Sequence, residues 1–141
     1  QKVEADSIYL IPPRKNMTIY NNTLYLSDQE KKPYINLPID MFFASLAEDA
    51  GKNAIGIILS GTGSDGTRGI KAIKEVGGMV MVQDSRSAKF DGMPNSSIST
   101  GLVDFVLSAE EMPKRLIDYL KHPLISKNKK ATETDNSFQQ K

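Results

Sequence analysis

The sequence predicts an α/β fold, with a doubly wound, mainly parallel sheet and an antiparallel hairpin. The first observation is the order of elements around a glycine-rich loop: the apolar run AIGIILS (residues 54–60) precedes a helical pattern (67–76) and a second apolar run, MVMV (79–82). Strand, helix and strand within about thirty residues form a βαβ unit, whose right-handed crossover joins parallel strands. The second observation is MTIYNNTLYLS (17–27), where Asn21 and Asn22 separate two short alternating runs, as in a hairpin with a tight turn.

The remaining elements follow from local patterns. SIYLIPP (7–13) is apolar and β-rich, and its two prolines stop it. Residues 38–50 place apolar side chains at spacings of three and four between Pro38 and Gly51, which predicts an amphipathic helix. We expect a short helix over residues 94–101, a strand in LVDFVL (102–107), and a last helix that begins at a Ser108 cap with Glu110 and Glu111 in its first turn.

Composition limits the class of protein. A chain of 141 residues suits one core, and its net charge of +1 gives no electrostatic footprint for nucleic acid or an anionic membrane. Without cysteine there is no disulfide or thiolate metal site, and no apolar run approaches the roughly 20 residues that span a bilayer. We therefore expect a soluble, cytoplasmic protein without metal or cofactor, whose domain covers residues 1–124. The polar residues 125–141 are expected to form a disordered tail or linker.

The loop SGTGSDG (60–66) is the main candidate site, because ligands and catalytic groups lie beyond the carboxyl ends of parallel strands. Three interpretations of Asp65 compete. Ser64 or Asp65 could simply cap the following helix. The glycines could cradle a phosphate, although the loop matches neither the Walker A nor the dinucleotide-binding motif. Asp65 could instead be the acid of a Ser-His-Asp triad.

The residues give no obvious partners for a triad. The only histidine, His122, ends the last helix, where a cation interacting with the helix dipole is its ordinary role. No serine lies in a G-x-S-x-G elbow; Ser60 is too close to the loop to reach a histidine held by Asp65, and Ser45 lies mid-helix.

The motifs SGTGSDGTRGIKAIKEVGG and VQDSRSAKFDGMPNSSISTGLVDFVL, with DSIYLIPPRKNMTI upstream, strongly resemble the C-terminal part of the CheB-type chemotaxis methylesterase family. The resemblance covers about residues 3–121. It is closest to hybrids in which a CheR-type methyltransferase domain follows. It implies hydrolysis of glutamyl methyl esters, and in some members deamidation of glutamines, on the cytoplasmic helices of chemoreceptors.

The resemblance also implies site residues. The family's triad acid carries over onto Asp65, while its serine and histidine correspond to sequence before Gln1, so we expect a partial domain that is inactive alone. Thr62, Gly63, Ser64 and Met93 are expected near the substrate or oxyanion. A non-catalytic docking or regulatory module beside the methyltransferase is the alternative, and a small phosphate-binding domain is a third. The exposed apolar edge of an incomplete sheet would also favour self-association.

Overall fold

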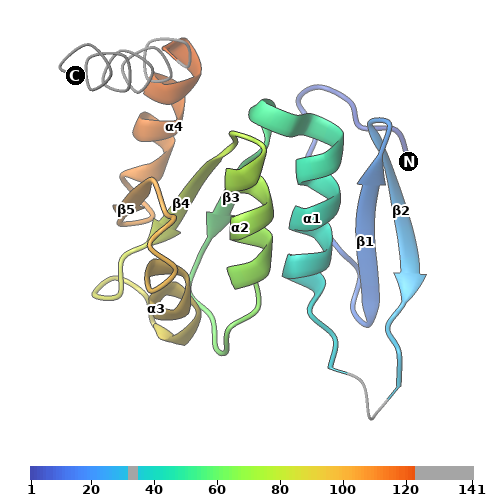
Figure 1. Cartoon of the computed structure of the whole chain (residues 1–141), viewed down its shortest axis with the longest axis horizontal. Helices are drawn as coiled ribbons and strands as arrows, with labels where there is room; N and C mark the ends of the chain where they lie inside the picture. The colour runs from blue at the N-terminus through green and yellow to red at the C-terminus, as the bar shows by residue number, and fades with distance from the viewer. Residues whose placement is uncertain (32–34, 123–141) are drawn as a thin grey trace, which may run out of the picture. The chain divides into compact units, whose positions relative to one another are not determined.

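The computed structural model describes residues 1–31 and 35–122. The chain divides into two units, Gln1–Ser108 and Ala109–Lys141, and the predicted tail at 125–141 lies outside the described residues. The elements are labelled in Figure 1. In chain order they are β1 (Lys15–Tyr20), β2 (Thr23–Asp28), α1 (Pro38–Ala50), the 3-10 turn η1 (Gly51–Asn53), β3 (Ile55–Ile58), α2 (Thr67–Glu75), β4 (Met79–Gln83), α3 (Gly92–Ile98), β5 (Phe105–Leu107) and α4 (Met112–Lys121).

The predicted βαβ unit is confirmed. Strands β3, β4 and β5 form a parallel sheet in that order, with Ile58 opposite Val82 and Val82 opposite Val106. Helix α2 connects β3 to β4, and α3 lies in the connection from β4 to β5. The α/β class with an additional antiparallel hairpin therefore follows the sequence expectation.

The hydrophobic core lies between the parallel sheet and helices α1 and α2. Alternate residues of β4 point into it, and Val80 and Val82 have no exposed surface. Helix α2 supplies Ile70 and Ile73, also fully buried, because these residues recur on one face at helical spacing. The buried members of this cluster are Phe43, Ala47, Ala54, Ile58, Ile70, Ile73, Val80 and Val82.

Gly69 allows α1 and α2 to pack closely. A Cβ atom at this position would lie 2.5 Å from Cβ of Phe43 and 3.0 Å from Cδ2 of the same ring. A contact that short is far inside van der Waals distance and involves an atom fixed to the backbone of α1. Glycine at position 69 therefore sets how near the two helix N-termini can approach.

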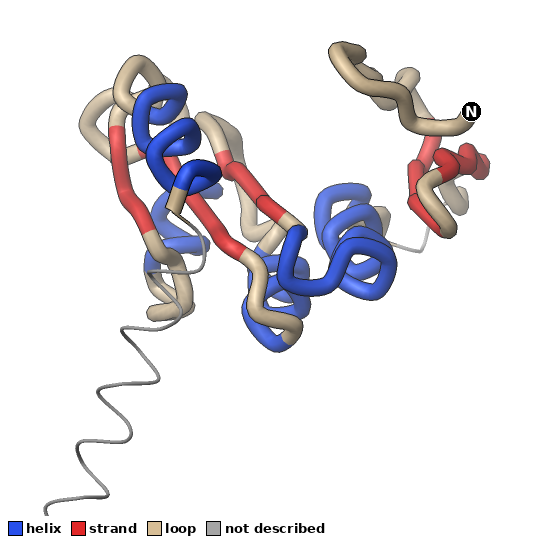
Figure 2. The backbone as a smooth tube through the Cα atoms, turned by 90° about the horizontal axis from the view of Figure 1, so that it is seen from above, coloured by secondary structure: helices blue, strands red, loops and turns tan. Residues whose placement is uncertain are grey.

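The hairpin β1–β2 packs on the other side of α1, so that α1 lies between the hairpin and α2 (Figure 1, Figure 2). Asn21 and Asn22 adopt φ values of +50° and +60°, as the predicted tight turn requires. The carboxylate of Asp49 in α1 accepts hydrogen bonds from the backbone N–H groups of both asparagines, at 2.6 and 3.1 Å. Ser45 Oγ accepts a further bond from the N–H of Ile19 at 3.0 Å.

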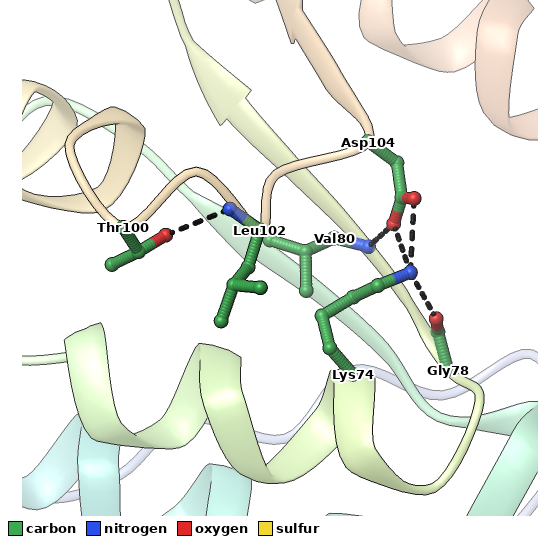
Figure 3. A network of polar contacts seen from close by, with 6 residues as sticks. All are labelled: Lys74, Gly78, Val80, Thr100, Leu102 and Asp104. Carbon is green, nitrogen blue, oxygen red and sulfur yellow. Dashed lines mark hydrogen bonds and ion pairs between the residues drawn. The ribbon is translucent and has the colours of Figure 1, made fainter.

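A polar network joins the end of α2 to the start of β4 (Figure 3). Lys74 of α2 donates to both carboxylate oxygens of Asp104, at 2.9 and 2.8 Å, and to the carbonyl oxygen of Gly78 at 3.0 Å. Asp104 Oδ2 also accepts the backbone N–H of Val80 at 2.9 Å. One ion pair thus joins the end of α2, the start of β4 and the residue before β5.

The structure corrects the expected β character of residues 7–13 and the bounds of later elements, including the strand expected over residues 102–107, which spans Phe105–Leu107. Residues 7–13 form no strand: Ile8 and Leu10 are 90% and 85% exposed, and regular pairing begins only at Lys15, after the two prolines that cannot donate backbone hydrogen bonds. Helix α3 spans Gly92–Ile98 rather than residues 94–101, because its first turn is already fixed by the loop described below.

The last helix also begins later than predicted. Helix α4 starts at Met112, with Pro113 in its first turn and Glu111 as the N-cap residue, and no side-chain cap bond forms. Proline is favoured in a first turn, where its missing N–H costs no helical bond, and this preference outweighs the Ser108 signal. Among the helices of the described residues, none has the length and apolar character to cross a membrane.

Candidate active site

The carboxyl ends of β3 and β4 bring two loops together at one edge of the sheet. Gln83, the last residue of β4, is only 8% exposed and lies between these loops. Its Oε1 accepts the N–H of Ser60 at 2.8 Å, and its Nε2 donates to Ser87 Oγ at 3.2 Å. A buried amide side chain thus satisfies one polar group from each loop, as burial of an amide requires.

Further bonds join the loop 60–66 to the residues that lead into α3. Ser60 Oγ accepts the N–H of Phe90 at 2.9 Å, and the N–H of Gly61 donates to the carbonyl of Phe90 at 2.9 Å. The N–H of Met93 donates to the carbonyl of Gly61 at 2.9 Å. The Met93 side chain lies against Gly61, since a Cβ there would be 3.3 Å from its sulfur. The structure therefore places Met93 beside the glycine-rich loop.

The tip of the loop is exposed. Thr62, Gly63 and Ser64 are all accessible, and Gly63 has a φ of +86°, which favours glycine. Within the part of the chain that the structure describes, the backbone N–H groups of these three residues donate to no acceptor. Free, adjacent N–H groups are the donors that an oxyanion uses.

Asp65 is half-buried and caps a helix, but not the one that follows it. Its Oδ2 accepts the N–H of Ile39 and its Oδ1 the N–H of Asp40, each at 2.9 Å. These are the second and third residues of α1, whose first N–H groups have no partner within the helix. The interpretation in which Ser64 or Asp65 caps α2 is wrong, because α2 has Gly66 as its N-cap and no side-chain bond of its own there.

Asp40 performs the reciprocal task for α2. Its Oδ1 accepts the N–H of Gly66 at 2.9 Å and that of Gly69 at 2.8 Å. Gly66 has a φ of +106°, and a Cβ there would lie 2.9 Å from Cδ1 of Ile58, so this approach needs glycine. Each of the two helices is therefore capped by a carboxylate carried by, or adjacent to, the other.

The electrostatics suit two carboxylates at this point. A helix N-terminus carries a partial positive charge and stabilises a nearby anion. Here the Asp65 carboxylate lies at the N-terminus of α1, and the Asp40 carboxylate lies at the N-terminus of α2. A carboxylate has about four acceptor positions, of which those on Asp65 receive two backbone N–H groups. The remaining capacity allows Asp65 to accept a hydrogen bond from an imidazole N–H.

A further carboxylate, that of Asp84 after β4, is held by its own loop. Asp84 Oδ1 accepts the N–H of Ser87 at 2.9 Å, and its Oδ2 accepts the Ser87 hydroxyl at 3.0 Å. The backbone hydrogen bond from Ser87 is the main reason that the pKa of Asp84 lies below its ordinary value. This turn stiffens the loop that ends at Phe90.

The described residues do not complete a triad beside Asp65. The hydroxyl of Ser60 is engaged with Phe90, and Ser45 donates to the carbonyl of Phe42 within α1 at 2.8 Å. His122 is the C-cap residue of α4, in the second unit. Within residues 1–31 and 35–122 no group of three or more His, Asp or Glu side chains could hold a metal ion.

Sequence reasoning missed Asp40. An acidic residue in the first turn of a helix is ordinary, and the sequence marks it only as favourable for α1 itself. Its bonds to Gly66 and Gly69 depend on the packing of α1 against α2, which no local pattern encodes.

Comparisons with known proteins agree with the geometry. Residues 1–116 match the family described as CheB methylesterase. The chain is 35% identical, over 83% of its length, to a putative protein-glutamate methylesterase/protein-glutamine glutaminase of Leptospira interrogans, and covers 61% of that protein. It is 44% identical, over 84% of its length, to an uncharacterised 104.1 kDa protein of Rhodobacter capsulatus, of which it covers 12%.

A solved structure shows the same fold. The crystal structure of the Thermotoga maritima CheB methylesterase catalytic domain superposes with a TM-score of 0.69 at 31% sequence identity, covering 78% of this chain and 60% of that domain. The chain therefore spans between about a tenth and three-fifths of the relatives named here.

Proposed function

This chain belongs to the CheB methylesterase family, and from that premise we propose that it is the part of a protein-glutamate methylesterase that supplies the triad acid, Asp65. The observation that carries the proposal is the position of Asp65. Its carboxylate lies at the carboxyl end of a parallel strand, is fixed by two backbone N–H groups, and keeps acceptor capacity for an imidazole.

In the proposed reaction, a serine Oγ attacks the ester carbonyl of a glutamyl methyl ester while a histidine takes its proton. The histidine gives that proton to the departing oxygen, which leaves as methanol, and water then hydrolyses the acyl-enzyme to a glutamate side chain. Asp65 orients the histidine and stabilises the imidazolium. The free N–H groups at Thr62 to Ser64, together with Met93, which lies against Gly61, are the proposed contacts of the substrate or oxyanion.

We propose that the serine and histidine come from sequence upstream of Gln1, so that residues 1–141 alone have no esterase activity. The substrate would be a methylated chemoreceptor helix in the cytoplasm, and glutamine deamidation a second reaction. The partial coverage of the relatives supports an incomplete site, and the match to 12% of a 104.1 kDa protein supports a multidomain parent. We propose that this parent includes a methyltransferase domain.

The test uses the complete protein that carries these residues and measures methanol release from a receptor-derived peptide with a glutamyl methyl ester. Asp65→Asn should lower kcat by about 10⁴-fold, the loss that this change causes in a serine-protease triad. Asp49→Asn, in the same helix α1 but bonded only to the hairpin turn, should leave kcat unchanged.

A second candidate function follows from the structural role of Asp65 as the cap of α1. In a non-catalytic docking or regulatory module beside a methyltransferase, Asp65 would act only as that cap. An inactive complete protein in which Asp65→Asn changes only the melting temperature would favour the module. Activity of residues 1–141 by themselves would contradict the proposal that the site is incomplete.

A further inference from the structure

We propose that Asp40 is a positioning residue for Asp65, and that it acts through both its side chain and its backbone. This inference rests on the proposed function, because it concerns the placement of the triad acid. Asp40 contacts neither substrate nor histidine in the proposal; it holds the group that does.

The loop before α2 cannot hold Asp65 by its own torsional preferences. Glycine at positions 61, 63 and 66 gives the backbone wide freedom, and Gly63 and Gly66 lie in the left-handed region. Within the described residues, the exposed tip, Thr62 to Ser64, receives two long hydrogen bonds from outside the loop, from Ser96 Oγ to the carbonyl of Gly63 and from the N–H of Thr67 to the carbonyl of Ser64, each at 3.4 Å. Contacts outside the loop must therefore fix the carboxylate.

Asp40 supplies contacts to the backbone that follows Asp65 and to the Asp65 side chain. Its Oδ1 accepts the N–H of Gly66, which fixes the peptide unit directly after Asp65, and the N–H of Gly69 one turn into α2. Its own N–H donates to Asp65 Oδ1, next to the bond from Ile39 to Oδ2. The backbone and the side chain of the acid are thus both held by one residue of α1.

Loss of the Asp40 carboxylate would release only one of these two constraints directly. The N–H groups of Gly66 and Gly69 would lose their acceptor, and the loop would be free to move Asp65 away from α1. A misplacement of about 1 Å in a catalytic group costs roughly 10²-fold in rate, without any loss of substrate contacts. The change is therefore expected in kcat rather than in KM.

The chain offers a matched control. Asp49 lies in the same helix and also accepts two backbone N–H groups, those of Asn21 and Asn22 in the hairpin turn. Asp49→Ala removes the same number of carboxylate–amide bonds from α1 but does not touch the loop 60–66. It therefore reports the effect of destabilisation alone.

The kinetic test compares Asp40→Ala, Asp40→Asn and Asp49→Ala in the complete protein. Asp40→Ala should lower kcat by about 10²-fold with KM nearly unchanged. Asp40→Asn keeps an amide oxygen that accepts both N–H groups, and should restore most of the lost kcat. A fall in kcat no larger than that of Asp49→Ala, or an effect confined to KM, would overturn the proposal.

A second measurement does not require catalysis and separates this inference from the proposed function. Amide hydrogen exchange at Ile39 reports its bond to Asp65 Oδ2, an atom that Asp40 does not contact. Asp40→Ala should accelerate exchange at Ile39, whereas Asp49→Ala should not. An unchanged rate at Ile39 would overturn the positioning role; an inactive wild-type protein with accelerated exchange would overturn the esterase proposal and leave Asp40 as the residue that places Asp65.

Discussion

Lys74 and Asp104 form an ion pair whose side chains are only 22% and 20% exposed, and which joins α2 to the residue preceding β5 (Figure 3). The carboxylate of Asp104 also accepts the N–H of Val80, a residue with no exposed surface. The pair therefore does more than neutralise charge. It satisfies a buried backbone donor at the start of β4, where the sheet and the helix meet.

Asp104→Ala should lower the free energy of unfolding by about 1–3 kcal/mol, because it leaves the buried N–H of Val80 without an acceptor. Lys74→Met should cost less, since Asp104 keeps that bond and part of its hydration. Urea denaturation of the complete protein measures both values. Lys71→Met, at an exposed position of the same helix, should change stability by less than about 0.5 kcal/mol. Equal losses for Asp104→Ala and Lys71→Met would contradict this account.

Gly69→Ala tests whether packing or helix propensity determines the effect of residue 69 on the stability of the fold. Propensity alone predicts that alanine stabilises a helix interior by about 1 kcal/mol. The structure predicts the opposite sign, a loss of about 1–3 kcal/mol, because the new methyl group would meet Cβ of Phe43. Thermal unfolding gives the sign directly, and a stabilised Gly69→Ala protein would show that α1 and α2 are not as close as described.

The lowered pKa of Asp84 gives a pH dependence with a definite sign. A carboxyl group whose pKa is lower in the folded protein stabilises the fold at pH above its ordinary value of 3.8, and this contribution disappears as the pH falls through the folded pKa. A carboxyl titration by NMR should place the Asp84 midpoint below 3.8. Ser87→Ala should raise it only partly, because the main bond comes from the Ser87 backbone. A midpoint at or above 3.8 in the wild-type protein would contradict the turn.

Residues 1–141 alone should self-associate through the open edge of the parallel sheet. Within the described residues β3 pairs only with β4, and Ile57 and Leu59 at this edge are 37% and 50% exposed. Sedimentation velocity should show a mass that rises with concentration, and Ile57→Lys should reduce that rise. The control is Val76→Lys, at the C-cap residue of α2, whose exposed fraction of 38% is close to that of Ile57. A monomer at all concentrations would rule this out.

Much of the fold is predictable because its signals are local. The positive φ of Asn21 and Asn22, the helix from Pro38 to Gly51 and the strand–loop–helix–strand order each follow from residue types at fixed spacing. Residues 7–13 show the limit of such reasoning. Apolar, β-branched composition does not make a strand where no strand among the described residues supplies hydrogen-bond partners.

The candidate site is predictable only in part, for the same reason. The position of Asp65 at a strand end follows from the order of elements, and its proposed role rests on the likeness of its loop to a family motif. Its bonds to Ile39 and Asp40 join residues 26 and 25 positions apart, and depend on the close approach that Gly69 allows. Tertiary packing of α1 on α2, rather than any pattern within the loop, decides which helix the acid caps.

The cap that Asp65 forms on α1 changes what an aspartate at this position of a sequence indicates. An aspartate that caps α1 stabilises the fold whether or not the protein has a nucleophile. The S-G-T-G-S-D-G motif in a new sequence therefore identifies the fold and does not by itself indicate esterase activity. Inactive relatives of such an enzyme should be recognised by replacement of the serine and histidine, since the aspartate would remain in them as a helix cap.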